Sequence, residues 1–341
     1  MSNPARPASD CGLTLVSYGR QGHRQEYIDF FSRTLAGGLI PSLAEHWRDA
    51  VPVAEPVLFL MIEEDTVGFA RAAIRRSLAG RRTVGLLFRP VECARPRSTR
   101  TLVKGLAMRV LKRWPGVSVI SILPADVEPA VISVATDWIY DPQLWDLPTV
   151  GASVMSAMAV EIREAAGDRT VVVALGAQNE DKGFHQFVEI WRSSEQLRER
   201  FLFVAAGKVA SESKGMADEF VRAGGLLRDG FVSDEDMAGA YAVADLMWSC
   251  YGPQYNQASG IFGRAVQRAV PVVVRRNSYV EAQARRFGFP NLSLDWTEAR
   301  EAAAKLLGWS PPDRPNTANL VAGMRARSLK ALTQSLGRWT A

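Results

Sequence analysis

The chain has 341 residues, of which 47% are hydrophobic and 23% are charged, a balance typical of a globular protein that excludes a disordered or fibrous chain. This length predicts two domains, because single hydrophobic cores rarely grow beyond about 250 to 300 residues. The spacing of Cys11, Cys93 and Cys250 fits neither a disulfide framework nor a zinc site. The sequence also shows neither a signal-peptide core nor an apolar run long enough to span a membrane. We therefore expect a cytoplasmic protein.

The amino-terminal half alternates predicted strands with predicted helices. A glycine-containing turn over residues 18–22 leads into a helix, and a second helix is predicted over residues 65–79. The predicted strands are residues 13–17, 57–62, 83–88 and 117–123. This alternation predicts a parallel α/β sheet, in which ligands bind at the carboxyl ends of the strands.

Positive charge is concentrated between Thr66 and Arg113. Eleven arginines and two lysines face one acidic residue there, a net charge of +12 in a chain whose total is +5. Residues 101–114 predict a basic amphipathic helix, whose apolar residues at helical spacing are Leu102, Leu106, Val110 and Trp114. Such a helix is typical of peripheral contact with an anionic membrane, here the inner face. The alternatives are a solvated basic face over a core helix and a nucleic-acid surface, for which we find no recognition motif.

Residues 226–282 predict a helix, a strand, a loop, a helix and a strand. Ser233 precedes three acidic residues, which predicts a helix start, and a buried strand follows at 246–248. A loop then leads to a helix over about 262–269 and a β-branched strand over 271–274. The small residues 258–260 precede that second helix, whose free N–H groups favour an anion. With the Ser259 hydroxyl this predicts a phosphate site; the alternative is an ordinary strand-to-helix turn.

The order of these pieces resembles the nucleotide-binding half of retaining, GT-B-type glycosyltransferases of family four. The matching pieces are residues 230–234, 241–245, 246–249 and 271–273, with residues 171–176 and 180–183 resembling the first strand and Lys-Gly turn of that half. The resemblance implies an α/β protein with two Rossmann-like domains facing a central cleft. Residues 1–165 would bind the acceptor, residues 166–315 would bind the nucleotide sugar, and residues 316–341 would form a helix crossing back to the first domain.

The resemblance also implies a set of site residues. The donor diphosphate and sugar would lie at Lys182, Arg264, Ser259, Gly260, Asn256 and Gly176. Asn256 and Arg264 replace the family's two glutamates, and Ala177 replaces its arginine. Arg264 would supply the cation that Ala177 lacks, and Asn256 would hydrogen-bond the donor sugar without charge. The loop after the first strand makes Arg20, Gly22, His23 and Arg24 candidates for the acceptor side.

The implied function is transfer of a sugar, with retention, from a nucleoside diphosphate sugar to a saccharide or lipid-linked acceptor in bacterial surface polysaccharide synthesis. No Asp-x-Asp motif stands where a metal-dependent transferase needs it, so we expect no metal and no cofactor besides the sugar nucleotide. No catalytic residue is identified. The three departures leave open a catalytically silent protein of this fold that binds a nucleotide sugar, a glycan or a partner transferase, and sugar-nucleotide epimerisation is a third alternative.

Overall fold

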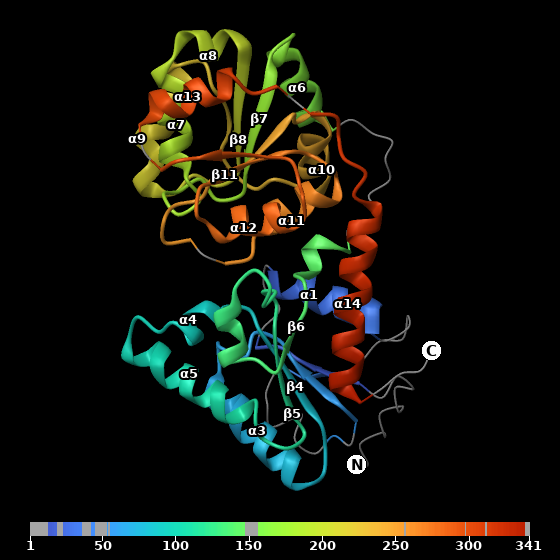
Figure 1. The fold of residues 1–341 in the computed structure, drawn as a ribbon. Helices are drawn as coiled ribbons and strands as arrows, with labels where there is room; N and C mark the ends of the chain where they lie inside the picture. Colours follow the sequence, from blue (N-terminus) through green and yellow to red (C-terminus); the bar gives the residue numbers. More distant parts are fainter. Residues whose placement is uncertain are drawn as a thin grey trace, which may run out of the picture. The chain divides into compact units, whose positions relative to one another are not determined.

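The structure is a computed structural model, and it describes residues 13–18, 23–35, 42–44, 53, 55–146, 156–255, 257–296, 298–310 and 312–337. The chain divides into two compact units (Figure 1). The first unit comprises Met1–Pro142 and Gly323–Ala341, and the second comprises Gln143–Ala322. None of the described helices combines the length and apolar character that crossing a membrane requires.

The first unit contains a parallel sheet of six strands in the order β2-β1-β3-β4-β5-β6. The strands are β1 (Thr14–Val16), β2 (Ser42–Ala44), β3 (Val57–Phe59), β4 (Thr83–Leu87), β5 (Val117–Ser121) and β6 (Asp137–Trp138). Its helices are α1 (His23–Leu35), α3 (Thr66–Leu78), α4 (Pro90–Ala94), α5 (Thr99–Leu111) and α14 (Ala318–Leu336), with the 3-10 turn η1 (Pro129–Ser133). Helices α3, α4 and α5 cover one face of the sheet, and α1 and α14 cover the other (Figure 1). This is the alternation that the sequence predicts.

One arginine of the basic segment is a core residue. Arg76 of α3 is fully buried, and its guanidinium donates to the Thr83 hydroxyl at 3.0 Å and to the carbonyls of Val53 and Glu55 at 2.6 Å each. Burial lowers the pKa of Arg76 to about 10. This side chain therefore ties α3 to the start of β4 and to the approach to β3, and it contributes no surface charge.

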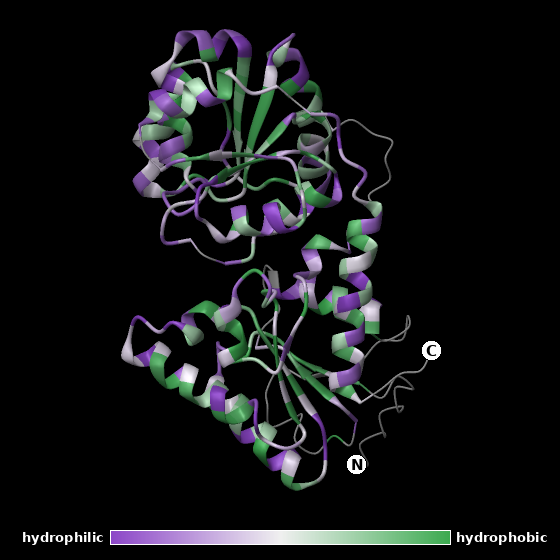
Figure 2. Cartoon of the chain, in the orientation of Figure 1, coloured by the Kyte–Doolittle hydropathy of each residue, from purple (hydrophilic) through white to green (hydrophobic). Residues whose placement is uncertain are grey.

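The second unit contains another parallel six-stranded sheet, in the order β12-β11-β10-β7-β8-β9. The strands are β7 (Thr170–Leu175), β8 (Phe201–Ala206), β9 (Leu226–Arg228), β10 (Leu246–Ser249), β11 (Val272–Arg275) and β12 (Asn291–Leu294). The helices are α6 (Ala157–Ala166), α7 (Phe184–Ser193), α8 (Glu195–Arg200), α9 (Lys214–Arg222), α10 (Asp234–Val243), α11 (Gly260–Gln267), α12 (Tyr279–Arg286) and α13 (Ala299–Leu307). Figure 2 shows that the strands are predominantly hydrophobic, as expected for strands covered on both faces.

The border between the units differs from the one expected at residue 165. Helix α6 belongs to the second unit because it packs on α10, where a Cβ on Gly239 would lie 2.2 Å from the Ser156 hydroxyl oxygen. The border therefore falls after Pro142.

Near the C-terminus, Ser328 and Arg327 of α14 contact the rest of the first unit. The Ser328 hydroxyl accepts from the Tyr140 amide at 3.0 Å, and Arg327 pairs with Asp137 at 2.6 Å.

Candidate functional site

The turn after β7 presents Lys182 at the carboxyl edge of the second sheet. The Lys182 amide donates to the Asn179 side chain at 2.9 Å, and Gly183 follows in the left-handed conformation with φ of 75°. A Cβ on Gly183 would lie 2.1 Å from the Cys250 carbonyl oxygen, so no other residue fits there. The Lys182 backbone is thus fixed between the ends of β7 and β10.

Two tyrosines hold the Lys182 ammonium. Its Nζ donates to the Tyr255 hydroxyl at 2.9 Å and lies 4.2 Å from the centroid of the Tyr255 ring and 4.6 Å from that of Tyr251. No carboxylate among the described residues pairs with this ammonium. Cation–π contacts attract a cation without neutralising it. The edge therefore carries a positive charge that remains available to an anion.

The loop that carries these tyrosines is tied down on both sides. The Gly252 amide donates to the Asp181 carbonyl at 2.9 Å, and the Arg275 Nε donates to the Tyr251 carbonyl at 2.9 Å. The Tyr251 hydroxyl is 2.7 Å from the Ser259 hydroxyl. Burial raises the pKa of Tyr251, although the nearby Lys182 charge opposes the shift. Tyr251 is therefore a neutral, buried support for the lysine.

Helix α11 begins at Gly260, two residues before the predicted start, and Ser259 is its N-cap. The Ser259 hydroxyl accepts from the Phe262 amide at 3.3 Å, so it serves the helix as well as contacting Tyr251. The next two amides, those of Gly260 and Ile261, make no hydrogen bond to a described residue. Packing also favours glycine at position 260, since a Cβ there would lie 2.0 Å from the Gln143 Oε1. The helix thus offers two free donors.

Arg264 of α11 contacts α10. The Arg264 Nη1 donates to the Met237 sulfur on α10 at 3.3 Å, and the Tyr241 hydroxyl on α10 donates to the Ile261 carbonyl at 3.0 Å. The charge of Arg264 opposes, without outweighing, the burial that raises the Tyr241 pKa. Arg264 therefore lies against α10, whereas Lys182 lies against the tyrosine loop. Asn256, the other departure from the family pattern, lies outside the described residues.

Gly176 lies at the end of β7 in a row of three strand ends made of backbone. The Gly176 amide donates to the Ala206 carbonyl at 3.0 Å, and the Gly207 amide donates to the Arg228 carbonyl at 2.9 Å. A Cβ on Gly207 would lie 1.8 Å from the Gly176 carbonyl oxygen. Gly230 closes the row after β9, and the next side chain, Phe231, is 96% exposed. The strand ends at this edge are therefore joined by main-chain hydrogen bonds, and the Phe231 ring is exposed beyond the last of them.

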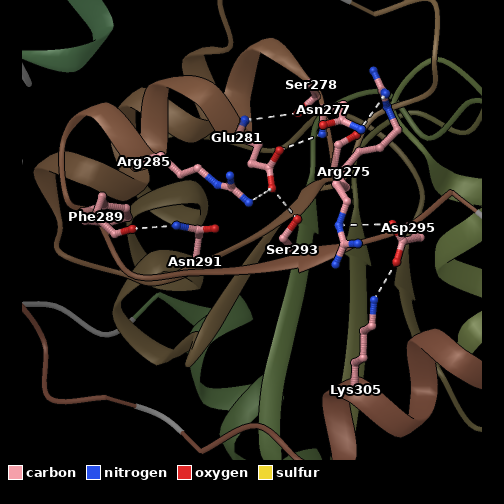
Figure 3. Close-up of polar contacts among 11 residues, drawn as sticks. Arg275, Asn277, Ser278, Glu281, Arg285, Phe289, Asn291, Ser293, Asp295 and Lys305 are labelled. Carbon is pink, nitrogen blue, oxygen red and sulfur yellow. Dashed lines mark hydrogen bonds and ion pairs between the residues drawn. The ribbon is translucent and has the colours of Figure 1, made fainter.

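The strand-end region at β11 and β12 is a polar network around a buried carboxylate (Figure 3). Glu281 accepts from the Asn277 amide at 2.6 Å, from Arg285 at 2.9 Å and from the Ser293 hydroxyl at 2.5 Å. Lys305 pairs with Asp295 at 2.6 Å in the same region. Because every oxygen of Glu281 is engaged, this glutamate supports the turn between β11 and α12, and we assign it no ligand contact.

In the first unit, the acceptor-side candidates fall mostly outside the described residues. Arg20 and Gly22 are outside them, and His23 is described only as the first residue of α1. Arg24 forms a bidentate pair with Glu64, with distances from 2.9 to 3.1 Å. Arg24 and Glu64 therefore bring opposite charges together beyond the carboxyl end of β3.

A buried carboxylate lies next to this pair in the sequence. Glu63 accepts from the backbone amides of Phe88 and Arg89 at 3.2 and 3.1 Å, and burial raises its pKa to about 7 despite these bonds.

Within the described ranges, no group of three or more His, Cys, Asp or Glu residues is placed to hold a metal ion.

The tyrosines at 251 and 255 were missed as site residues in the sequence. Their position in the sequence could have identified them, since both follow a predicted strand and lie in the loop that leads to the predicted anion site. Nothing in the local sequence indicated that Lys182, 69 residues earlier than Tyr251, would lie over their rings. That proximity arises because β7 and β10 are neighbours in the sheet.

Structural comparison finds similar architecture in known proteins, whereas no protein-family model and no curated protein sequence matches the chain. Anabaena Alr3699/HepE in complex with UDP aligns over 95% of both chains with a TM-score of 0.61 at 14% identity. An α,α-trehalose-phosphate synthase (UDP-forming) from Burkholderia xenovorans, in complex with glucose-6-phosphate, aligns over 95% of this chain and 96% of its own with a TM-score of 0.55 at 11% identity. An Escherichia coli trehalose-6-phosphate structure bound with UDP-2-fluoro glucose covers 86% of this chain and 76% of its own, with a TM-score of 0.61 at 8% identity. The chain therefore has the GT-B fold of two Rossmann-like domains.

Proposed function

We propose that the chain is a glycosyltransferase that binds a nucleoside diphosphate sugar on the second unit and transfers its sugar to a saccharide or lipid-linked acceptor. One observation carries the proposal: the Lys182 ammonium, which pairs with no carboxylate among the described residues, contacts the loop that leads to the N-terminus of α11, where two amides make no hydrogen bond to a described residue. A diphosphate is the ligand whose charge and oxygens suit a cation and backbone donors together.

The similar structures support a uridine nucleotide as the donor. Alr3699/HepE is described with UDP and with UDP-glucose, and the B. xenovorans synthase is UDP-forming. On this chain, the base would lie near the end of β7 at Gly176, with the exposed Phe231 ring as a candidate for stacking. Aromatic rings stack on nucleobases with little regard to sequence, so this ring would add affinity for the base.

The residues also supply the electrostatic part of the reaction. As the bond to the anomeric carbon breaks, negative charge grows on the departing diphosphate, and Lys182 with the Gly260 and Ile261 amides would stabilise that charge. Retention of configuration, independence of metal and a role in bacterial surface polysaccharide synthesis rest on the family-four resemblance. A saccharide acceptor would contact the first unit, where Arg24 and Glu64 offer hydrogen-bonding groups.

A catalytically silent protein is the second candidate, favoured by Arg264. This arginine stands in place of a glutamate in the family pattern, and its Nη1 donates to the Met237 sulfur. In that case the second unit would still bind a nucleotide sugar, and no product would form.

Calorimetric titration with uridine, guanosine, adenosine and thymidine diphosphates and their sugar conjugates tests the proposal. We expect one base to bind, with an affinity that its sugar alters and that Lys182→Ala lowers. Failure of the folded protein to bind any member of the panel would contradict the donor site. Binding without product, against a panel of saccharide and lipid-linked acceptors, would favour the silent candidate.

A further inference from the structure

Helix α5 turns its apolar side toward solvent. The helix buries Gly105, Met108 and Leu111, and Gly105 packs so closely on α4 that a Cβ there would lie 2.2 Å from the Cys93 carbonyl oxygen. Four more apolar side chains lie on the opposite side, where the exposed fractions of Leu102, Val103, Leu106 and Val110 are 44, 61, 51 and 58%. At about 100° per residue these four fall within an arc of about 100°. The apolar stripe predicted over residues 101–114 is therefore not a core stripe.

Further exposed apolar side chains lie on neighbours of α5. Val67 and Leu78 of α3, which contacts α5, are 60% and 79% exposed. Ile132 of η1 is 60% exposed, and its carbonyl accepts a hydrogen bond from the Lys112 ammonium of the α5 C-cap. Seven of the ten large apolar side chains that the described part of the chain exposes thus belong to α3, α5 or Ile132. We call these seven residues the apolar face.

Free arginines accompany the apolar face. Arg71 of α3, Arg100 and Arg109 of α5, and Arg113 just after it make no hydrogen bond or ion pair through their side chains with the described residues. On the α5 wheel, Arg109 lies about 20° from Leu102. Other cations of the segment are structural, because Arg76 is buried and Lys104 donates to the Glu63 carbonyl at 2.6 Å. The unpaired charge is therefore concentrated beside the apolar residues.

We propose that the apolar face docks on an anionic lipid bilayer, with the α5 stripe entering the headgroup region and the four arginines meeting lipid phosphates. A lipid surface supplies hydrocarbon and negative charge together, which matches both the apolar face and the arginines beside it. Single-stranded nucleic acid supplies the charge and relies on stacking, yet the seven exposed side chains are all aliphatic. An acidic protein would need its own apolar patch of matching shape. The inference is independent of the proposed glycosyl transfer, because the face lies wholly on the first unit.

Co-sedimentation of the full chain with vesicles tests the docking. We expect binding to vesicles of phosphatidylcholine mixed with phosphatidylglycerol, weak binding to phosphatidylcholine alone, and loss of binding in high salt. Changing Arg100, Arg109 and Arg113 together to Glu should lower the partition coefficient by ~100-fold or more, since each basic residue near an anionic surface contributes about a factor of five. Changing Leu102, Leu106 and Val110 together to Ser should also lower it while leaving the salt dependence in place.

Matched controls come from the second unit. Arg163, Lys214 and Arg300 are exposed and their side chains contact no described residue, so their joint change to Glu should leave vesicle binding almost intact. Val160→Ser with Val221→Ser, at side chains 36% and 50% exposed, is the control for the apolar change. Binding that survives either α5 triple change, with unfolding temperatures unaltered, would overturn the proposal. So would a wild-type protein that ignores anionic vesicles but binds RNA or an acidic protein through the same arginines.

Discussion

The Lys182 ammonium lies 4.2 Å from the centroid of the Tyr255 ring and donates to the hydroxyl of the same residue at 2.9 Å. That hydroxyl donates in turn to the Ala258 carbonyl at 3.1 Å, so a chain of hydrogen bonds runs from β7's turn to the start of α11. Tyr255 orients the lysine and keeps its charge unneutralised. The two pieces predicted separately from the sequence, the Lys-Gly turn and the anion site before α11, thereby belong to one place.

Replacing Lys182 by Ala should weaken binding of UDP about 10- to 100-fold, because hydrogen bonds to charged groups contribute about 1.5 to 3 kcal/mol. Uridine, which lacks phosphate, should bind the variant and the wild type equally. Calorimetry measures both ligands. Lys214→Ala on α9 is the control, and equal losses for UDP and uridine would show that the change acts on the fold instead of on the diphosphate.

Removing the Tyr255 hydroxyl separates the two contacts of that residue. Tyr255→Phe keeps the ring under the ammonium and should weaken UDP binding only a few-fold, whereas Tyr255→Ala removes both contacts and should weaken it about 10-fold or more. Titration calorimetry of the two variants gives the comparison. Identical affinities for both would mean that the ring contact contributes nothing.

Arg264→Ala should weaken UDP binding less than Lys182→Ala does. The Arg264 Nη1 donates to the Met237 sulfur on α10, whereas the Lys182 ammonium contacts the loop that leads to α11, so we expect Lys182 to contribute more to diphosphate binding. Affinities of the two single variants and the double variant, measured together, show whether the residues share a ligand. Strictly additive effects would place Arg264 outside the diphosphate site.

Gly183→Ala should destabilise the second unit by at least about 2 kcal/mol, because the new Cβ would lie 2.1 Å from the Cys250 carbonyl oxygen in addition to the strain of φ at 75°. Gly224→Ala is a matched control. Gly224 has φ of 84° and open space around its Cβ direction, so its substitution should cost only about 1 kcal/mol. Urea unfolding measures both, and equal costs would disprove the close approach.

Glu63 should make the stability of the first unit depend on pH. Burial raises its pKa from the ordinary 4.5 to about 7, so the folded state favours the protonated form. The resulting stabilisation is complete below pH 4.5 and is lost as the pH rises through 7, by roughly 3 kcal/mol. Glu63→Gln should remove this dependence. Urea unfolding at pH 5 and pH 8 tests the difference, and parallel pH profiles for the two proteins would contradict it.

The fold followed from the sequence wherever elements were long and periodic. The Ser233 cap before α10 and the strands β4 and β5 lie where the pattern predicts them, and β7 lies where the family resemblance places it. The strands β2, β9 and β12 contain no β-branched residue and show no alternation, so they were missed. The domain border was placed too late because α6 has an ordinary helical pattern, and only its packing on α10 shows which unit it joins.

The candidate site was predictable in its parts and not in its assembly. Lys182, Ser259 and Gly260 carry local signals, a Lys-Gly turn and a capped helix. The pairing of Lys182 with two tyrosines depends on which strands become neighbours, a long-range property that local spacing does not encode. The apolar stripe of α5 shows the same limit, because helical spacing identifies a stripe but not whether the stripe faces inward.

The backbone row at Gly176, Gly207 and Gly230 limits which substitutions this edge of the sheet accepts. All three glycines have positive φ, and a Cβ on Gly207 would lie 1.8 Å from the Gly176 carbonyl oxygen. A side chain at any of these positions therefore strains the backbone, and at Gly207 it would also collide with the neighbouring strand end. The flanking residues carry no such restriction, so we expect sequence variation beside the row and not within it.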